Sequence, residues 1–276
     1  MKRETKQSLG QEWISEFRMV GTYIRYNMLA AAELRVSFTM QVVGMMINNC
    51  SFLLIWIFFF QAFGKINGWG STEVIGLQAF TALAYGLAFS FFSGAAELPV
   101  ALHNGFFDSL LLTPKNLYLR ILTLVTRISA IGDILFGVLF LIGYVLLAQL
   151  NLIQIGVLIS LLIPATLFMI NLLLITSCLG FFIPDARELG KAAFEIVFGP
   201  SLYPAGIFQG GVRFFFIFIF PALIMGGLPI EAVQEISWEK VLTIWIVAIV
   251  WTFFAISFLN IGRKRYESGN LTGARV

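Results

Sequence analysis

Long stretches without any charged residue dominate this sequence. Residues 36–64, 74–96 and 241–262 contain none, and residues 134–184 are uncharged over a length that fits two membrane crossings. A helix needs about 20 apolar residues to cross the hydrocarbon core of a bilayer. The polar stretch 149–154 interrupts the longest run and is expected to form a turn. The pattern predicts five spanning helices, at residues 36–64, 74–96, 128–148, 153–183 and 241–262.

The composition agrees with this pattern. Hydrophobic residues make up 59% of the 276 positions and charged residues 12%, whereas a soluble domain has about 45–50% apolar and about 25% charged residues. An ordinary soluble enzyme is therefore excluded, and so is a disordered chain, which needs low hydrophobicity and high charge. The net charge of +3 comes from scattered basic residues, so no nucleic-acid partner is expected.

Motifs for common catalytic chemistry are missing. A phosphate-binding loop needs Gly-x-x-x-x-Gly-Lys-Ser/Thr, but Lys65 and Lys191, which follow glycines, are succeeded by isoleucine and alanine. One histidine and two distant cysteines do not make a zinc site. The sequence also lacks His-Glu-x-x-His and Gly-x-Ser-x-Gly. We expect no enzyme activity and no bound cofactor in this chain.

Basic residues predict the orientation. The last apolar run ends in Arg263, Lys264 and Arg265, which the positive-inside rule retains in the cytoplasm. The N-terminus lacks a signal peptide and is expected there too. Both ends share one side only if the number of spans is even, so a sixth span is required. The resulting topology has 15 of the 18 Lys and Arg residues inside.

Two segments compete for the position of the fifth span. Residues 196–212 and 214–230 are both uncharged over 17 positions. The charge count slightly favours 214–230, because Arg213 would then be inside. Against it, Pro221 and a pair of glycines break the run, as in a re-entrant segment. The residues alone leave both assignments open.

Residues 1–35 are expected to form an amphipathic helix ahead of the first span. Trp13, Phe17, Val20, Ile24 and Met28 recur at steps of three and four, which places them on one helical face. Such a helix can lie along the inner leaflet with its apolar side in the membrane. The alternative is a helix that packs on another subunit.

The loop at residues 97–120 is far longer than a simple connection between spans requires. Gly105 can end one short helix and Pro114 a second, with Asp108 as the cap that begins the second helix. Two short cytoplasmic helices can form a docking element. They can equally form an interfacial hairpin that only anchors the ends of the spans.

Polar residues inside the predicted spans are few. Asn48, Asn49, Gln78 and Asn171 are expected to be interhelical hydrogen-bonding groups. A proton-coupled transporter needs several ionisable groups along a path, and Asp133 and Glu195 are too few. The chain thus offers neither an ion relay nor an ATPase, and an external motor is the simplest energy source.

The loop carries a resemblance to a known family. Its order of an acidic residue, a glycine, an aspartate and an apolar run ending in proline resembles the permease subunits of type-2 ABC exporters. In this chain the pattern reads Glu97, Asn104-Gly105, Phe107-Asp108, Leu110-Leu111-Leu112 and Pro114. A second stretch, with Tyr203-Pro204, Phe208, Val212-Arg213, Pro221 and Glu231, is similar to the external region of that family.

The resemblance implies an all-α fold with six transmembrane helices and both ends in the cytoplasm, as one permease domain over residues 1–276. It implies that 188–208 is the fifth span, that 212–230 is an external re-entrant hairpin, and that Glu195 lies in the membrane. Either the pKa of this carboxyl group is then raised or a partner compensates its charge, and Lys191 at i−4 and Arg187 are the candidate partners. Pro200 and Pro204 are expected to kink the span.

The resemblance also implies partners. Two ATPase subunits would hold ATP and Mg²⁺, and a second permease, identical or different, would complete the substrate path in a prokaryotic plasma (inner) membrane among its lipids. Contact with the ATPase would come from Glu97, His103, Asn104, Gly105, Asp108 and Pro114. The substrate path would be formed by Asn48, Asn49, Phe52, Gln78, Tyr85 and Glu195.

Two other classes of protein fit the apolar pattern. A membrane scaffold or integral enzyme subunit that does not transport would need no docking hairpin. A secondary transporter usually shows inverted repeats, and no such repeat is visible between the two halves. The sequence does not choose among drugs, polysaccharides, lipids and peptides as the exported substrate.

Overall fold

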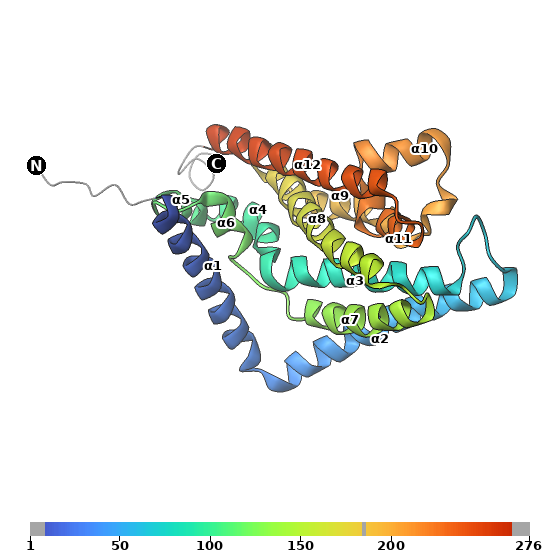
Figure 1. Cartoon of the computed structure of the whole chain (residues 1–276). Helices are drawn as coiled ribbons and strands as arrows, with labels where there is room; N and C mark the ends of the chain where they lie inside the picture. Colours follow the sequence, from blue (N-terminus) through green and yellow to red (C-terminus); the bar gives the residue numbers. More distant parts are fainter. Residues whose placement is uncertain (1–8, 184–185, 267–276) are drawn as a thin grey trace, which may run out of the picture.

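The computed structural model describes residues 9–183 and 186–266, nearly all of which are helical (Figure 1). Five helices are long and apolar enough to cross a membrane, as the uncharged runs predict. The predicted cytoplasmic segments at 1–8 and 267–276 lie outside the described residues. The five long helices are α2 (Arg35–Phe63), α3 (Ser71–Phe92), α7 (Ala130–Leu147), α8 (Leu152–Ser177) and α12 (Trp238–Arg265).

Helix α3 is the centre of the bundle and is the most extensively buried of these five helices. It packs most closely against α7, at points where one helix has a glycine. A Cβ atom on Gly137 would lie 2.6 Å from the Leu83 Cβ, and one on Gly86 would lie 2.7 Å from the Ile134 backbone nitrogen. Since any larger residue would overlap its neighbour, these glycines set the separation of the two helices.

The shorter elements gather at the two ends of the bundle. At the left end in Figure 1 are α4 (Leu98–His103), α5 (Phe106–Leu111), α6 (Leu117–Leu122) and the C-terminal end of α12. Helix α1 (Leu9–Ala32) runs across this end at a steep angle to α2. At the right end are the loop between α2 and α3, α10 (Gly210–Phe214) and α11 (Gly227–Gln234).

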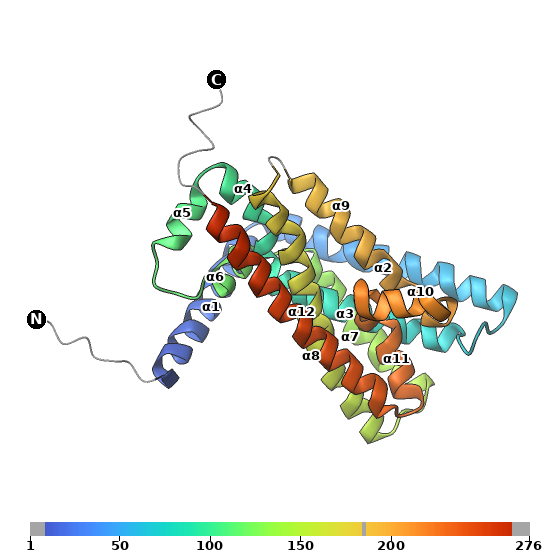
Figure 2. The ribbon, with the colours of Figure 1, turned by 90° about the horizontal axis from the view of Figure 1, so that it is seen from above.

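Residues 187–208 extend from one end of the bundle to the other, alongside the long helices (Figure 2). At one end the Arg187 Nη2 lies 3.3 Å from the Glu97 Oε1. At the other, the Asn67 side chain donates a 3.0 Å hydrogen bond to the Gly206 carbonyl. Residues 187–208 therefore connect the two ends of the bundle.

The expected single kinked helix over 188–208 is wrong in its detail. Helix α9 (Arg187–Phe198) has only 12 residues, about 18 Å of helix, which is too short to cross a bilayer. It stops at Gly199 and Pro200, and two 3₁₀ turns, Gly199–Leu202 and Ala205–Ile207, complete the path. Proline has no backbone N–H to continue the helix, so the segment is interrupted instead of bent.

Residues 208–234 remain at the right end of the bundle in Figure 1. The segment consists of α10, a π-helical turn (Phe215–Ile219), a 3₁₀ turn (Ala222–Met225) and α11. The C-terminal end of the segment lies beside the start of α8, because the Gln154 side chain donates a 2.9 Å hydrogen bond to the Val233 carbonyl. It therefore forms a hairpin that returns to the end from which it starts.

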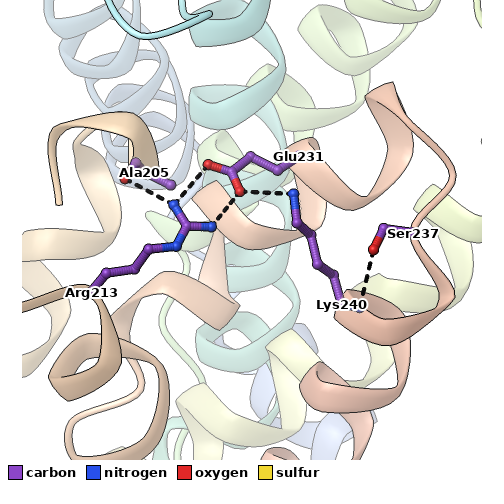
Figure 3. A network of polar contacts seen from close by, with 5 residues as sticks. All are labelled: Ala205, Arg213, Glu231, Ser237 and Lys240. Atoms are coloured by element: carbon purple, nitrogen blue, oxygen red, sulfur yellow. Dashed lines mark hydrogen bonds and ion pairs between the residues drawn. The ribbon is translucent and has the colours of Figure 1, made fainter. Parts of the chain in front are cut away.

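An ionic cluster ties this hairpin to α12 (Figure 3). Arg213 donates two hydrogen bonds to the Glu231 carboxylate, at 3.1 and 2.5 Å, and Lys240 donates a third at 3.1 Å. Burial alone would raise the pKa of Glu231, but the bonds and charges of Arg213 and Lys240 lower it below its ordinary value. Arg213 also donates to the Ala205 carbonyl at 3.4 Å. The cluster therefore joins α10, α11 and α12 to the end of the segment 187–208.

The α3–α7 contact makes a testable prediction. Gly137→Ala should lower the free energy of unfolding by about 1–3 kcal/mol, because the new methyl group meets the Leu83 backbone. Gly143→Ala is the matched control in the same helix, since no atom lies within 4 Å of its Cβ position. Thermal melting of the purified protein in detergent measures both. Equal melting temperatures for the two variants would contradict the proposed role of Gly137.

Candidate functional site

A cavity of about 520 Å³ lies between α2, α3, α8 and α9. All six residues predicted for the substrate path line it, although they come from three separate helices. The structure therefore brings this predicted set together, while its role in transport stays a prediction. The six are Asn48, Asn49, Phe52, Gln78, Tyr85 and Glu195.

A buried carboxyl group lies in the cavity wall. Asp133 is 4% exposed, and its Oδ1 accepts a 2.6 Å hydrogen bond from the Asn49 side chain. No described residue donates to its Oδ2. A buried carboxyl oxygen without a donor is costly, so this atom is a natural acceptor for a proton or for a donor group on a substrate. The predicted path omits Asp133, although its position as an ionisable residue in a span was a signal for it.

Aromatic rings form one side of the cavity. The ring of Tyr85 stacks on Phe89 at a centroid distance of 4.1 Å, and Phe194 lies edge-on to Phe89 at 5.5 Å. Phe198 packs on Tyr85 at 5.4 Å. The guanidinium of Arg127 lies 5.2 Å from the Phe89 centroid, a cation–π contact that fixes a positive charge in the wall. Phe52 extends the apolar surface on the α2 side.

The polar groups of α9 do not pair as expected. Lys191 binds Glu188 at 2.6 Å and Arg187 binds Glu97. The expectation that Lys191 and Arg187 neutralise Glu195 is therefore wrong, because each has another carboxylate within reach. Glu195 is exposed, and the described residues contain no ion pair with it. Its carboxylate faces a cavity that it shares with the cation of Arg127.

The other amides act between helices. The Gln78 side chain donates a 2.8 Å hydrogen bond to the Leu202 carbonyl, which joins α3 to the interrupted part of the fifth segment. Asn171 donates to the Thr252 hydroxyl at 2.8 Å and accepts from the Tyr118 hydroxyl at 2.7 Å. Asn48 is exposed and lines the edge of the cavity.

The loop after α3 contains two short helices, α4 and α5, separated by Gly105 at φ +74°. A left-handed conformation of this kind favours glycine. Asp108 is not the cap of the second helix: the Asn104 side chain accepts from the Phe106 backbone N–H at 3.0 Å, and Asp108 lies in the first turn. Pro114 follows α5 in the connection to α6.

This hairpin of residues 98–112 has a buried and an exposed side. Phe107 is fully buried, between the rings of Phe181 and Tyr266. Arg120, itself buried, donates a hydrogen bond to the Leu110 carbonyl and holds the end of α5. The exposed side carries His103, Asn104, Phe106, Leu111 and Leu112.

Helix α1 is attached to the same loop. Lys115 lies 3.8 Å from Glu16, whose carboxylate also accepts from the Asn116 backbone N–H at 3.3 Å. The predicted apolar face of α1 is divided. Trp13 and Phe17 are 57% and 68% exposed, whereas Val20, Ile24 and Met28 are half-buried. The exposed aromatic part remains available for membrane contact, as the interfacial hypothesis requires.

The described residues contain no group of three histidine, cysteine, aspartate or glutamate side chains that could hold a metal ion. The site is an aromatic and polar cavity, and the Glu97–Arg187 ion pair joins it to the hairpin of residues 98–112. A molecule can bind in such a cavity.

The family model described as ABC-2 family transporter protein matches residues 46–270. No curated protein matches the chain. The matched region contains the hairpin, the ionic cluster of Figure 3 and every residue that lines the cavity except Met45.

The buried Asp133 makes a testable prediction. Asn49→Leu should lower the free energy of unfolding by about 1–3 kcal/mol, because it removes the only donor that the described residues provide to a buried carboxyl group. Asn48→Leu, at the adjacent exposed position, should change it by less than about 0.5 kcal/mol. Thermal melting in detergent provides the comparison. A larger loss for Asn48→Leu than for Asn49→Leu would refute this account of the pair.

Proposed function

We propose, because the chain belongs to the ABC-2 family of transporter proteins, that it is the transmembrane permease subunit of an exporter driven by separate ATPase subunits. The observation that carries the proposal is the connection of a cavity to a surface hairpin by the Glu97–Arg187 ion pair. The buried helix α3 also connects the two, because it lines the cavity and leads directly through a 3₁₀ turn into the hairpin.

Six crossings are proposed, with both ends in the cytoplasm. The path of residues 187–208 supports the fifth crossing, because its ends contact Glu97 at one end of the bundle and Asn67 at the other. The concentration of Lys and Arg at the end that bears the hairpin supports the orientation. Residues 212–230 then form the external re-entrant hairpin.

The hairpin of residues 98–112 is proposed to bind the ATPase. ATP and Mg²⁺ would be held by that partner, whose closure on ATP would push the hairpin. The exposed side, with His103, Asn104 and Leu112, is available for contact, whereas the buried side transmits force to the ends of α8 and α12. The ion pair with Arg187 carries the movement to α9 and thus to the cavity wall.

A second permease is proposed on the side of α2. This helix is the least buried of the five apolar helices, and it presents Asn48 at the edge of the cavity. An identical or a different permease placed there would enclose the path. The aromatic wall with its mixture of Asp133, Glu195 and Arg127 suits an amphipathic substrate exported across a prokaryotic plasma membrane.

Topology gives a first test. In a background with Cys50→Ala and Cys178→Ala, Gln209→Cys should react with an impermeant maleimide in intact cells. Leu112→Cys should react only after the membrane is permeabilised. Both positions are exposed, so access and not burial decides the result. Labelling of Gln209→Cys only after permeabilisation would contradict a crossing at 188–208.

Coupling gives a second test. Gly105→Val should reduce permease-dependent ATP hydrolysis by the complex purified with its native ATPase about fivefold or more, because a left-handed valine costs about 1–2 kcal/mol and displaces the hairpin. Asp108→Lys should also reduce permease-dependent ATP hydrolysis. The isolated permease should hydrolyse no ATP.

Gly64→Val is the matched control for this test. Gly64 has a similar φ of +71° and open space around its Cβ position, but it is the C-cap of α2 and begins the loop between α2 and α3, which lies at the opposite end of the bundle. A complex with Gly105→Val that hydrolyses ATP as fast as one with Gly64→Val would remove the hairpin from the mechanism. Purification without any protein that carries a phosphate-binding loop would favour the scaffold alternative.

A further inference from the structure

Tyr266 immediately follows the last turn of α12, and it contacts the hairpin of residues 98–112. Burial and, after it, the neighbouring Asp108 carboxylate raise the pKa of the Tyr266 hydroxyl. Its ring lies edge-on to Phe107 with centroids 4.9 Å apart. Residues 108 and 266 are separated by most of the chain, so this contact exists only because the fold brings the end of α12 to the hairpin.

The hairpin is seated firmly around this contact. Phe107 is fully buried and also meets Phe181 at 5.3 Å, beyond the end of α8. A Cβ atom on Gly180 would lie 3.1 Å from the Pro99 Cα atom of α4. The rings of Phe107, Phe181 and Tyr266 thus form a shared aromatic contact in which the hairpin touches the ends of two long helices.

Helix α12 extends from this contact to the opposite end of the bundle. Its first turn contains Lys240, which binds Glu231 in the ionic cluster of the external hairpin (Figure 3). Along its length it is joined to α8 by the Asn171–Thr252 hydrogen bond and by an edge-on contact of Phe168 with Trp251 at 5.3 Å. A helix of 28 residues held at both ends can transmit a displacement over its length.

We infer that Tyr266 is a positioning residue that couples the hairpin to α12, so that movement of the hairpin by the ATPase also displaces α12 and the external hairpin. The inference rests on the proposed function, because it requires that the ATPase moves the hairpin. It adds a second route, separate from the Glu97–Arg187 ion pair that leads to the cavity. The ring of Tyr266 provides the contact that carries the force.

The experiment measures movement of α12 relative to α8 in the native complex with its ATPase. Nitroxide labels at Leu152 and Leu242, which are 87% and 60% exposed, report the distance between the external ends of the two helices. Double electron–electron resonance is recorded with and without a nonhydrolysable ATP analogue. We expect the analogue to shift the distance distribution in the otherwise unaltered complex.

Tyr266→Ala loses the ring contact with Phe107 and should lower the ratio of shifted to unshifted molecules about fivefold or more, the effect of about 1 kcal/mol of aromatic contact. Tyr266→Phe retains the ring and should retain the shift. Tyr203→Ala is the matched control, because the ring of Tyr203 meets Trp56 of α2 and not the hairpin, and it should leave the shift unchanged.

The outcomes separate the inference from the proposed function. A full shift in Tyr266→Ala, together with a loss of permease-dependent ATP hydrolysis in Gly105→Val, overturns the inference alone. A normal rate in Gly105→Val overturns the proposed function of the hairpin and the inference with it. The absence of any shift in the unaltered complex also overturns the inference. If Tyr266→Ala fails to assemble with the ATPase, Tyr266→Leu, which removes the ring and keeps an apolar side chain, decides.

Discussion

The close packing of α3 against α7 is the interaction on which the rest of the structure depends. Gly86 and Gly137 allow backbone to approach side chain at distances that no larger residue permits. This contact buries the α3 core and fixes the direction in which its remaining face points. That face, with Gln78 and Tyr85, becomes one wall of the cavity. Because α3 runs on into the hairpin of residues 98–112, its placement also determines where the proposed docking element lies.

The cavity and the hairpin of residues 98–112 are therefore directly connected. The cavity is closed on the α9 side by Phe194 and Phe198, and α9 begins at Arg187, which binds the start of the hairpin. The interruption after Phe198 leaves α9 as a short helix whose two ends are held by different partners, Glu97 at one end and, through Leu202, Gln78 at the other. Because α9 is short, it can tilt as a unit when the hairpin moves. A continuous spanning helix would be harder to move independently of the other long helices.

Much of the fold follows from the sequence because membrane insertion depends on local composition. The uncharged runs predict the five long helices, and Gly105 and Pro114 predict the two short helices of the loop. The family resemblance, confirmed by the match over residues 46–270, guided the choice of residues that turn out to line one cavity.

The features that the sequence could not predict depend on contacts between distant segments. Lys191 had two carboxylates on its own helix, and only the packed structure shows that it binds Glu188. Arg127 joins the cavity because its backbone N–H donates to the Phe89 carbonyl, a contact without any local signal.

Site-specific photocrosslinking in the native membrane tests the central claim most directly. Leu112 is 85% exposed at the end of the hairpin of residues 98–112. Leu152 is 87% exposed at the start of α8, which is joined to α11 at the opposite end of the bundle. A photoreactive amino acid at position 112 should form an adduct with a protein that carries a phosphate-binding loop, while the same residue at 152 should not. If position 152 captures the ATPase and position 112 does not, the proposed orientation and the coupling role of the hairpin are both contradicted.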